Sequence, residues 1–448
     1  MKRTFVLIAC LCTLVVAGCT SESKLPNPTG KGSIRAFNAI PGSPEIRFLI
    51  EERTLDVIGY QDATSSLRYD DFEYNSNFEL FLPGEIEPDR VLTLSHKVET
   101  RRDDIFLLTG DPANPTLTVW STPEREWSDS DTVFEARFAH TINAQDAVDI
   151  YFDEAVVPAV VNNKVATLSY GEITDLSDYQ EGTYIVTITE AGDVNAVLFQ
   201  STELVFAVRS SVLIAGLAGD ENDTSSIVLS AMTTPGGDRK FTDATASPTV
   251  RFFHASYALQ TSDIYDDEML TSRRVENHAY GEITGDLDVS GDLETFYYTP
   301  TGSTAAILHQ FDYQAAPGRH ANLLILGPAD DYAVFSYLPD RASVSLYAKL
   351  NLFNAALDSN IIDLYLTASG VAIADDDLPT IQFALYPGVS LVKPVEAGSY
   401  DAYVTPVGEK TVLAGPLPID LVNGDIVNLL ALDTDTPDVV ELKIVPAP

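Results

Sequence analysis

One strand pattern occurs four times along the chain, and this repetition constrains the fold more than any other feature of the sequence. In each copy an apolar strand ends in His or Asn, and a second apolar strand begins eight residues later. The strand-ending residues are Asn38, His140, His254 and Asn354. Recurrence of one pattern at wide intervals indicates a chain built from copies of one structural unit. We therefore expect four related domains in tandem.

The second copy shows the strand pattern most clearly. Phe134, Phe138 and His140 fall on one side of an extended chain, and Glu135 and Arg137 fall on the other. This period of two is typical of a half-buried β-strand. About seven such segments, separated by Gly, Asn and Asp, occur in about 100 residues, and none carries an uninterrupted helical period. The sequence predicts an all-β chain of four tandem immunoglobulin-like antiparallel β-sandwich domains.

The length of 448 residues is too great for one ordinary core and suits three or four domains. The expected divisions are a lipoprotein signal peptide at 1–18, a tether at 19–31, and sandwich repeats at 32–122, 133–234, 248–338 and 340–448. An acidic joint at 123–131 and a flexible joint at 235–247 separate the first three repeats, whereas the last two adjoin without an obvious linker. We therefore expect a rod of four domains with a stiff contact between the last two.

The N-terminus has the pattern of a secretory signal. Lys2 and Arg3 precede an apolar stretch at 4–16, which is short for spanning a bilayer. The sequence Val-Ala-Gly-Cys at 16–19 resembles the lipobox of bacterial lipoproteins, and the alternative is an ordinary signal peptide with a chance cysteine. The resemblance implies acylation of Cys19, which would anchor the chain to a membrane. Thr20 stands where an aspartate would resemble an inner-membrane retention signal, so we expect a lipid-anchored protein of the bacterial cell envelope, at the outer membrane.

The cysteines and the net charge exclude several classes of site and partner. Cys10, Cys12 and Cys19 are the only cysteines, so the chain from Thr20 onward can form no internal disulfide, thiolate metal site or cysteine nucleophile. Its 27 basic and 66 acidic residues give a net charge of −39, which repels nucleic acid. Such a surface favours solubility, and collection of divalent cations is the alternative.

Short motifs recur in the same order in the second and third repeats. Arg-Phe-x-His at 137–140 and 251–254 is followed by Asp-Ile-Tyr at 149–151 and 263–265, and then by Tyr-Gly-Glu-Ile-Thr at 170–174 and 280–284. With Gly-Thr-Tyr at 182–184, this series resembles the bacterial domain of unknown function numbered four-three-nine-seven. The resemblance implies tandem immunoglobulin-like modules on secreted and lipid-anchored proteins, and it brings no assigned chemistry. The residues that carry the motifs are Arg137, His140, Asp149, Tyr151 and Tyr170 in repeat two, and Arg251, His254, Asp263, Tyr265 and Tyr280 in repeat three.

The histidines and tyrosines of these motifs allow a structural and a binding interpretation. His140 and His254 could bind a ligand or move protons, but neither has a second His or a Cys at metal-ligand spacing. We expect both to satisfy backbone groups where a strand meets a loop. The tyrosines could stack on carbohydrate, but we expect their hydroxyls to bond nearby backbone groups.

Arg137 and Asp149, and Arg251 and Asp263, are expected on the outward faces of successive strands. If those strands pair, each Arg meets its Asp across the ladder as an exposed ion pair worth under about 1 kcal/mol. In repeat one, Arg47 stands where the Asp would be, so that repeat cannot form the pair.

One acidic segment has some features of a calcium loop. Asp286, Asp288, Ser290 and Asp292 place oxygen ligands at alternate positions, with a glycine at the sixth position. The twelfth position is Tyr297, where a calcium loop needs a bidentate glutamate. Calcium binding and a solvated acidic loop both remain open, and we expect no other cofactor.

The sequence contains no Gly-x-Ser-x-Gly, phosphate-loop or His-Glu-x-x-His motif, so we do not expect an enzyme. We expect a structural, adhesive or scaffolding interaction module with an unknown protein or polysaccharide partner. The alternatives are a surface protein that captures polysaccharide or divalent cations, and an enzyme with a carboxylate site between repeats.

Overall fold

The computed structural model describes residues 27–155, 161–234, 236–329, 331–434, 436 and 439–445. The expected signal peptide, the acylation site Cys19 and most of the expected tether lie outside these residues. The described residues form 35 β-strands and contain no helix, which confirms the all-β fold. Within the same residues, accordingly, no helix has the length and apolar character needed to cross a membrane.

Domain 1 is a sandwich of two four-stranded sheets. Its strands are β1 (Lys31–Asn38), β2 (Ile46–Ile50), β3 (Arg53–Ile58), β4 (Leu67–Asp70), β5 (Glu73–Leu80), β6 (Asp89–Lys97), β7 (Arg102–Asp111) and β8 (Asn114–Pro123). One sheet has the order β4-β1-β7-β8 and the other β3-β2-β5-β6. The first two strands therefore lie in opposite sheets.

Domain 2 repeats this arrangement with two additional strands. Its strands are β9 (Val133–Thr141), β10 (Ala147–Glu154), β11 (Lys164–Ser169), β12 (Ser177–Gln180), β13 (Gly182–Glu190), β14 (Val197–Gln200), β15 (Leu204–Phe206), β16 (Ser211–Ala218), β17 (Ile227–Thr234) and β18 (Asp238–Phe241). The sheets are β12-β9-β16-β17-β18 and β11-β10-β13-β14, with β15 also paired to β13. Strand β18 lies within the segment 235–247 that we expected to be a flexible joint, because it pairs with β17 as an edge strand.

Domain 3 has eight strands in the order of domain 1. They are β19 (Thr249–His254), β20 (Ser262–Tyr265), β21 (Arg273–His278), β22 (Leu287–Asp288), β23 (Leu293–Pro300), β24 (His309–Gln314), β25 (His320–Leu326) and β26 (Ala333–Tyr337). They form the sheets β22-β19-β25-β26 and β21-β20-β23-β24.

Domain 4 divides one edge strand in two. Its strands are β27 (Ala348–Asn354), β28 (Ile361–Ala368), β29 (Ile381–Leu385), β30 (Gly388–Val389), β31 (Lys393–Val395), β32 (Gly398–Pro406), β33 (Ala414–Leu421), β34 (Ile426–Asp433) and β35 (Val440–Val445). The sheets are β30-β27-β34-β35, with β31 also paired to β27, and β29-β28-β32-β33.

One sheet of each domain contains a parallel pair of strands, and we call it the parallel-pair sheet. The pairs are β1 with β7, β9 with β16, β19 with β25, and β27 with β34, and the other pairings between named strands are antiparallel. Each domain has its own apolar core between its two sheets. Because full burial of one Phe or Leu side chain stabilises a fold by about 1.5–3 kcal/mol, such cores can hold the domains together without disulfides.

The outer faces of the parallel-pair sheets are also apolar, and they pack domains together in pairs. One buried cluster joins Phe37, Ala39, Ile105, Leu107 and Trp120 of domain 1 to Ala139, Leu213, Ala215, Leu217 and Met232 of domain 2. A second joins Phe253, Ala255, Leu324 and Leu326 of domain 3 to Phe353, Ala355, Leu430, Leu432 and Val445 of domain 4. The last two domains therefore have the close contact that we expected.

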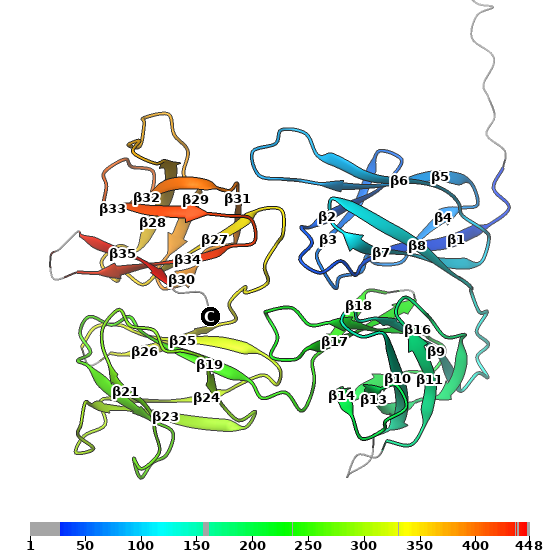
Figure 1. The fold of residues 1–448 in the computed structure, drawn as a ribbon, viewed down its shortest axis with the longest axis horizontal. Coiled ribbons are helices and arrows are strands. Elements are labelled where there is room, and N and C mark those ends of the chain that lie inside the picture. The colour runs from blue at the N-terminus through cyan, green and yellow to red at the C-terminus, as the bar shows by residue number, and fades with distance from the viewer. Residues whose placement is uncertain are drawn as a thin grey trace, which may run out of the picture.

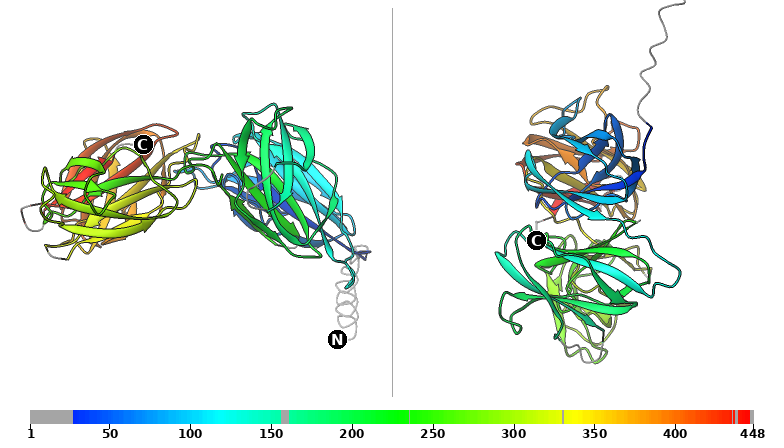
Figure 2. Two further views of the ribbon diagram at one scale, coloured as in Figure 1. Left: turned by 90° about the horizontal axis from the view of Figure 1, so that it is seen from below. Right: turned by 90° about the vertical axis from the view of Figure 1, so that its right-hand side faces the viewer.

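The four domains form two lobes, and the expected rod is wrong. Domains 1 and 2 stack in one lobe and domains 3 and 4 in the other (Figure 1), and a narrow waist joins the lobes (Figure 2). At this waist Arg319 Nη1 lies 2.6 Å from Asp223 Oδ1, and the Ser345 backbone N–H donates to Gly42 O over 3.0 Å. A rod needs polar outer sheet faces. Here the two strands of each parallel pair carry apolar residues on both faces, so the outer face must also be covered.

Candidate functional site

The strand-ending histidines satisfy backbone groups, as expected. His140 is fully buried, its Nε2 lies 3.1 Å from Gln145 O, and its Nδ1 accepts the Ile142 N–H over 3.2 Å. His254 is equally buried, and its Nε2 lies 3.3 Å from Gln260 O. Burial lowers the pKa of both imidazoles, which favours their neutral form.

The two asparagines at the same position make equivalent bonds. Asn38 Oδ1 accepts the Ile40 N–H and Asn354 Oδ1 accepts the Ala356 N–H, both over 3.1 Å. Their amide groups donate inward, as in the 2.9 Å bond from Asn354 Nδ2 to Ser359 O. In domains 1, 2 and 4 the position thus holds a planar group that both donates and accepts, which His and Asn can each do, whereas His254 Nδ1 accepts no hydrogen bond.

The expected pairs of Arg137 with Asp149 and of Arg251 with Asp263 are wrong. The first and second strands of each domain lie in opposite sheets, so they form no ladder across which an Arg could meet an Asp. All four side chains are buried, not exposed. Arg251 Nε instead donates to Thr284 O over 3.1 Å.

The two aspartates instead join neighbouring turns. Asp149 pairs with Lys164 Nζ at 2.7 Å and accepts the Gly192 N–H over 2.9 Å. Asp263 pairs with Arg273 at 3.3 Å and accepts the Gly302 N–H over 3.1 Å. Each therefore fixes the turn that follows the fifth strand of its domain. The motif tyrosines Tyr151 and Tyr265 lie on the same strands as Asp149 and Asp263, and both are buried.

The Tyr-Gly-Glu-Ile-Thr motif forms a turn against the first strand of the domain. In domain 2 the Gly171 N–H donates to His140 O over 2.7 Å, and Thr174 Oγ1 accepts the Phe138 N–H over 3.0 Å. Gly171 has a φ of 83°, and Gly281 in domain 3 has a φ of 76°. This left-handed conformation favours glycine, which explains the second residue of the motif.

The tyrosine of this motif has different partners in different domains. Tyr280 donates its hydroxyl to Asp433 O of domain 4 over 2.9 Å, whereas Tyr170 is 42% exposed and its ring contacts His140 edge to face. The expected bond to a backbone group is present at Tyr280, but it crosses to another domain.

The expected calcium ligands are not brought together. Asp286 uses both carboxylate oxygens to bind Arg341, at 2.6 and 2.9 Å. Asp288 belongs to β22, and Ser290 Oγ accepts the Asp292 N–H over 3.2 Å. Within the described residues no group of three or more His, Cys, Asp or Glu side chains could hold a metal ion. Asp286, the first expected calcium ligand, is paired with Arg341, so the structure does not support the calcium interpretation.

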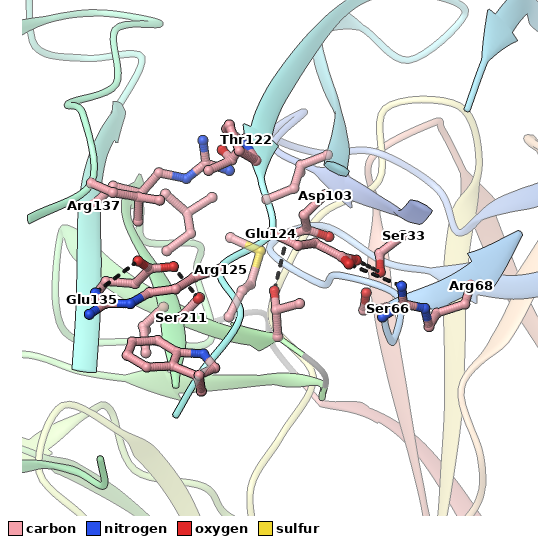
Figure 3. Close-up of a pocket in the computed structure, with 18 residues that line it drawn as sticks. Ser33, Ser66, Arg68, Asp103, Thr122, Glu124, Arg125, Glu135, Arg137 and Ser211 are labelled. Atoms are coloured by element: carbon pink, nitrogen blue, oxygen red, sulfur yellow. Dashed lines mark hydrogen bonds and ion pairs between the residues drawn. The ribbon is translucent and has the colours of Figure 1, made fainter. Parts of the chain in front are cut away.

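The strongest candidate site is a cavity of about 200 Å³ between domains 1 and 2 (Figure 3). Strands β1, β7 and β8 of domain 1 contribute to it, with β9, β16 and β17 of domain 2 and the joint between the domains. Its lining residues are Ser33, Ser66, Arg68, Asp103, Ile105, Thr122, Pro123, Glu124, Arg125, Trp127, Glu135, Arg137, Leu176, Ser211, Val212, Leu213, Met232 and Thr234. The acidic joint thus forms one wall of the cavity.

Two arginines of the cavity rim are engaged in ion pairs. Arg68 binds Glu124 at 3.0 Å. Arg125 binds Asp178 at 2.5 Å, lies 3.6 Å from Glu135, and places its guanidinium 4.2 Å from the centre of the Trp127 ring. These pairs leave little free charge at the rim of the cavity.

A second group of charges is buried deeper. Arg35 is fully buried and donates to Thr233 O over 2.8 Å and to Thr234 Oγ1 over 3.0 Å. Thr234 Oγ1 in turn donates to Asp103 Oδ2 over 3.0 Å. Burial raises the pKa of Asp103, although Arg35 opposes this shift.

Arg137 differs from the other arginines of the cavity. It is 7% exposed, and its side chain makes no hydrogen bond or ion pair with any residue that the structure describes. In Figure 3 it extends from β9 toward Thr122, and no dashed line reaches it. Burial lowers the pKa of Arg137 to about 10, and the nearby Asp103 opposes the shift.

The sequence motif contains Arg137, but its neighbours Arg35 and Asp103 could not be assigned to the same site from the motif alone. Arg35, Arg137 and Arg251 occupy one position of the first strand in three repeats. In the sequence, the repeated arginine lies on the same strand face as Phe37 and Phe253. The aromatic residues on this face were the available indication that it is buried.

Comparisons with known proteins assign no family to the chain. No protein family model matches it, and no curated protein matches it. A solved structure described as "The Bacillus anthracis TIE protein" is similar at 9% sequence identity with a TM-score of 0.15, over 91% of this chain and 69% of that chain. This likeness is too low to support any inference about the function of the present chain.

Proposed function

We propose that this chain is a lipid-anchored protein of the bacterial cell envelope that acts as a structural, adhesive or scaffolding interaction module, without catalysis. The pairing of domains through apolar sheet faces supports this proposal most directly. Such pairing gives a stiff body with several related surfaces, and a stiff body can hold partners at fixed positions. The motif resemblance to the bacterial domain of unknown function named above belongs to the same proposal.

The arrangement of the exposed surface fits an interaction role. The parallel-pair sheets are covered within each pair of domains, so the second sheets and the loops face outward. Several large apolar side chains on these loops are exposed, including Ile86, Met269, Leu378 and Leu391. Apolar side chains of this kind are found in the buried centres of protein interfaces.

The anchor is tested by palmitate labelling of the full-length chain in a bacterial host. Wild-type protein should incorporate label and fractionate with membranes, whereas Cys19→Ser should do neither, because only the cysteine thiol accepts the lipid. Equal labelling of the variant would remove the anchored part of the proposal.

The interaction role is tested with residues 27–448 coupled to beads. Beads carrying the protein should retain purified envelope fragments that beads carrying an unrelated acidic protein do not retain. Retention equal to that of the acidic control would count against adhesion or scaffolding, because the charge alone would then explain it.

A further inference from the structure

The unpaired guanidinium of Arg137 is the feature of the cavity that calls for a ligand. A buried charge without a hydrogen-bonding partner is costly, and buried charges in proteins are ordinarily paired. Asp103 lies close enough to affect the pKa of Arg137, but the two side chains form no ion pair. The planar fork of a guanidinium matches a carboxylate with two parallel hydrogen bonds.

Three further polar atoms of the cavity wall lack a hydrogen-bonding partner. They are Asp103 Oδ1, Thr122 Oγ1 and Ser66 Oγ, and each is closed off from solvent, so a ligand reaches it only when its side chain turns toward the cavity. A carboxylate oxygen accepts only, whereas the two hydroxyls can donate or accept. Together they complement hydroxyl groups of a ligand, which donate to Asp103 and exchange hydrogen bonds with Thr122 and Ser66.

The remaining wall combines apolar side chains with the paired charges of Arg68, Glu124, Arg125 and Glu135, and the cavity is small. Ile105, Leu213, Met232 and the ring of Trp127 supply surface for carbon-bound hydrogens. At about 200 Å³ the cavity is smaller than the roughly 300–1,000 Å³ pockets that hold drug-sized ligands. It therefore suits a ligand of one sugar unit or less and excludes an oligosaccharide chain.

The second pair of domains provides an internal comparison. The position of Arg137 on the first strand is Asn351 in domain 4, and the position of Asp103 on the seventh strand is His320 in domain 3. The corresponding region, a cavity of about 660 Å³, has Arg341 already paired with Asp286. The unpaired guanidinium is therefore a feature of the first pair.

We propose that the cavity between domains 1 and 2 binds a small hydroxy acid of sugar-acid size, with its carboxylate on Arg137 and its hydroxyls on Asp103, Thr122 and Ser66. This inference goes beyond the proposed scaffold role and does not depend on the anchor. The ligand enters past the joint at 124–131, which carries Glu124, Arg125 and Trp127 at the rim. Hydrogen bonds to the guanidinium and burial of one sugar face supply affinity, while the hydroxyl contacts supply selectivity.

Calorimetric titration and thermal melting of residues 27–448 with glucuronate, glucose and acetate test the proposal. Glucuronate should bind and raise the melting temperature, with a dissociation constant in the millimolar range or tighter. Glucose lacks the carboxylate and acetate lacks the hydroxyls, so each should bind at least about tenfold more weakly. Absence of any heat or melting shift with glucuronate would overturn the proposal, as would equal affinity for acetate.

Variants assign the binding to the cavity. Arg137→Gln should weaken glucuronate binding at least about tenfold, because the amide cannot form a charged fork. Arg209→Gln is the matched control, since Arg209 is half-exposed in the same domain and pairs with Asp129, and it should bind as wild type does. If Arg137→Gln fails to fold, Thr122→Val and Ser66→Ala should each weaken binding severalfold. Unchanged affinity in a folded Arg137→Gln variant, or in both hydroxyl variants, would contradict the assignment.

Discussion

Tyr60 and Tyr280 occupy the same turn in domains 1 and 3, and each donates its hydroxyl to a backbone carbonyl of the domain that follows. Tyr60 Oη lies 2.8 Å from Ala218 O, and Tyr280 Oη lies 2.9 Å from Asp433 O. Both carbonyls are at the end of the eighth strand of their domains, where β16 and β34 end. The two pairs of domains are therefore joined in the same way, by an apolar face and a tyrosine hydrogen bond at its edge.

Replacement of Tyr280 with Phe should destabilise the second pair of domains by about 1 kcal/mol. The substitution removes one hydroxyl and leaves Asp433 O without this donor. Loss of a hydrogen bond between neutral groups usually lowers the free energy of unfolding by about this amount. Urea unfolding of residues 27–448 measures the change. Tyr170→Phe is the matched control, because Tyr170 is exposed and should change stability by only a few tenths of a kcal/mol. Equal effects of the two substitutions would contradict the role of the interdomain bond.

Replacement of Leu324 with Asp should separate domains 3 and 4 without unfolding domain 3. Leu324 is fully buried on the outer face of its sheet, where it packs in the interdomain cluster and not in the core of domain 3. A charge there should cost several kcal/mol of interdomain stability, because neither partner surface can solvate it. Small-angle scattering should show a larger radius of gyration, and circular dichroism should retain the β-sheet signal.

Leu338→Asp is the control for this substitution, because Leu338 is exposed just after β26. It should leave the scattering curve unchanged. A compact Leu324→Asp variant would show that the apolar cluster does not hold the pair together.

The sequence predicted the repeated unit well, because the features that define it are local. The alternation of apolar residues, the strand-ending His or Asn and the Tyr-Gly-Glu-Ile-Thr motif are all read within a few residues. Each depends on backbone geometry or on hydrogen bonds between near neighbours, as in the bonds of His140 to Gln145 and Ile142.

The relations between sheets and between domains could not be read in the same way. Asp149 follows Arg137 by twelve residues, but the connection between their strands crosses the sandwich, so the two residues lie in different sheets. Period-two alternation shows that a strand has two faces without showing what covers each. The apolar outer face of β1, with Phe37, was therefore not recognised as a domain contact, and the cavity beside it was missed.

Acid should destabilise domain 3 through a buried histidine pair. The rings of His254 and His278 lie 5.5 Å apart, and neither Nδ1 has a hydrogen-bonding partner. Burial, reinforced by His254, lowers the pKa of His278 to about 4, although Glu282 opposes the shift. An unfolded histidine titrates near about 6.5, so between these two values the unfolded chain binds more protons than the folded one. The contribution of neutral His278 to the free energy of unfolding is therefore fully present above a pH of about 6.5. It falls as the pH is lowered and levels off below about 4, with a total loss of up to about 3 kcal/mol.

Urea unfolding at about pH 7.5 and about pH 5 measures this loss, and His278→Leu is the variant that assigns it. Leu168 occupies the same position in domain 2, opposite Val148, just as His278 lies opposite Ser262. A leucine therefore fits this site in the sandwich and carries no proton. The variant should lose a substantial part of the difference in unfolding free energy between the two pH values, while His254 keeps the remainder because its pKa is also lowered by burial. An unchanged pH dependence in His278→Leu would show that other groups, and not the buried histidine pair, make domain 3 sensitive to acid.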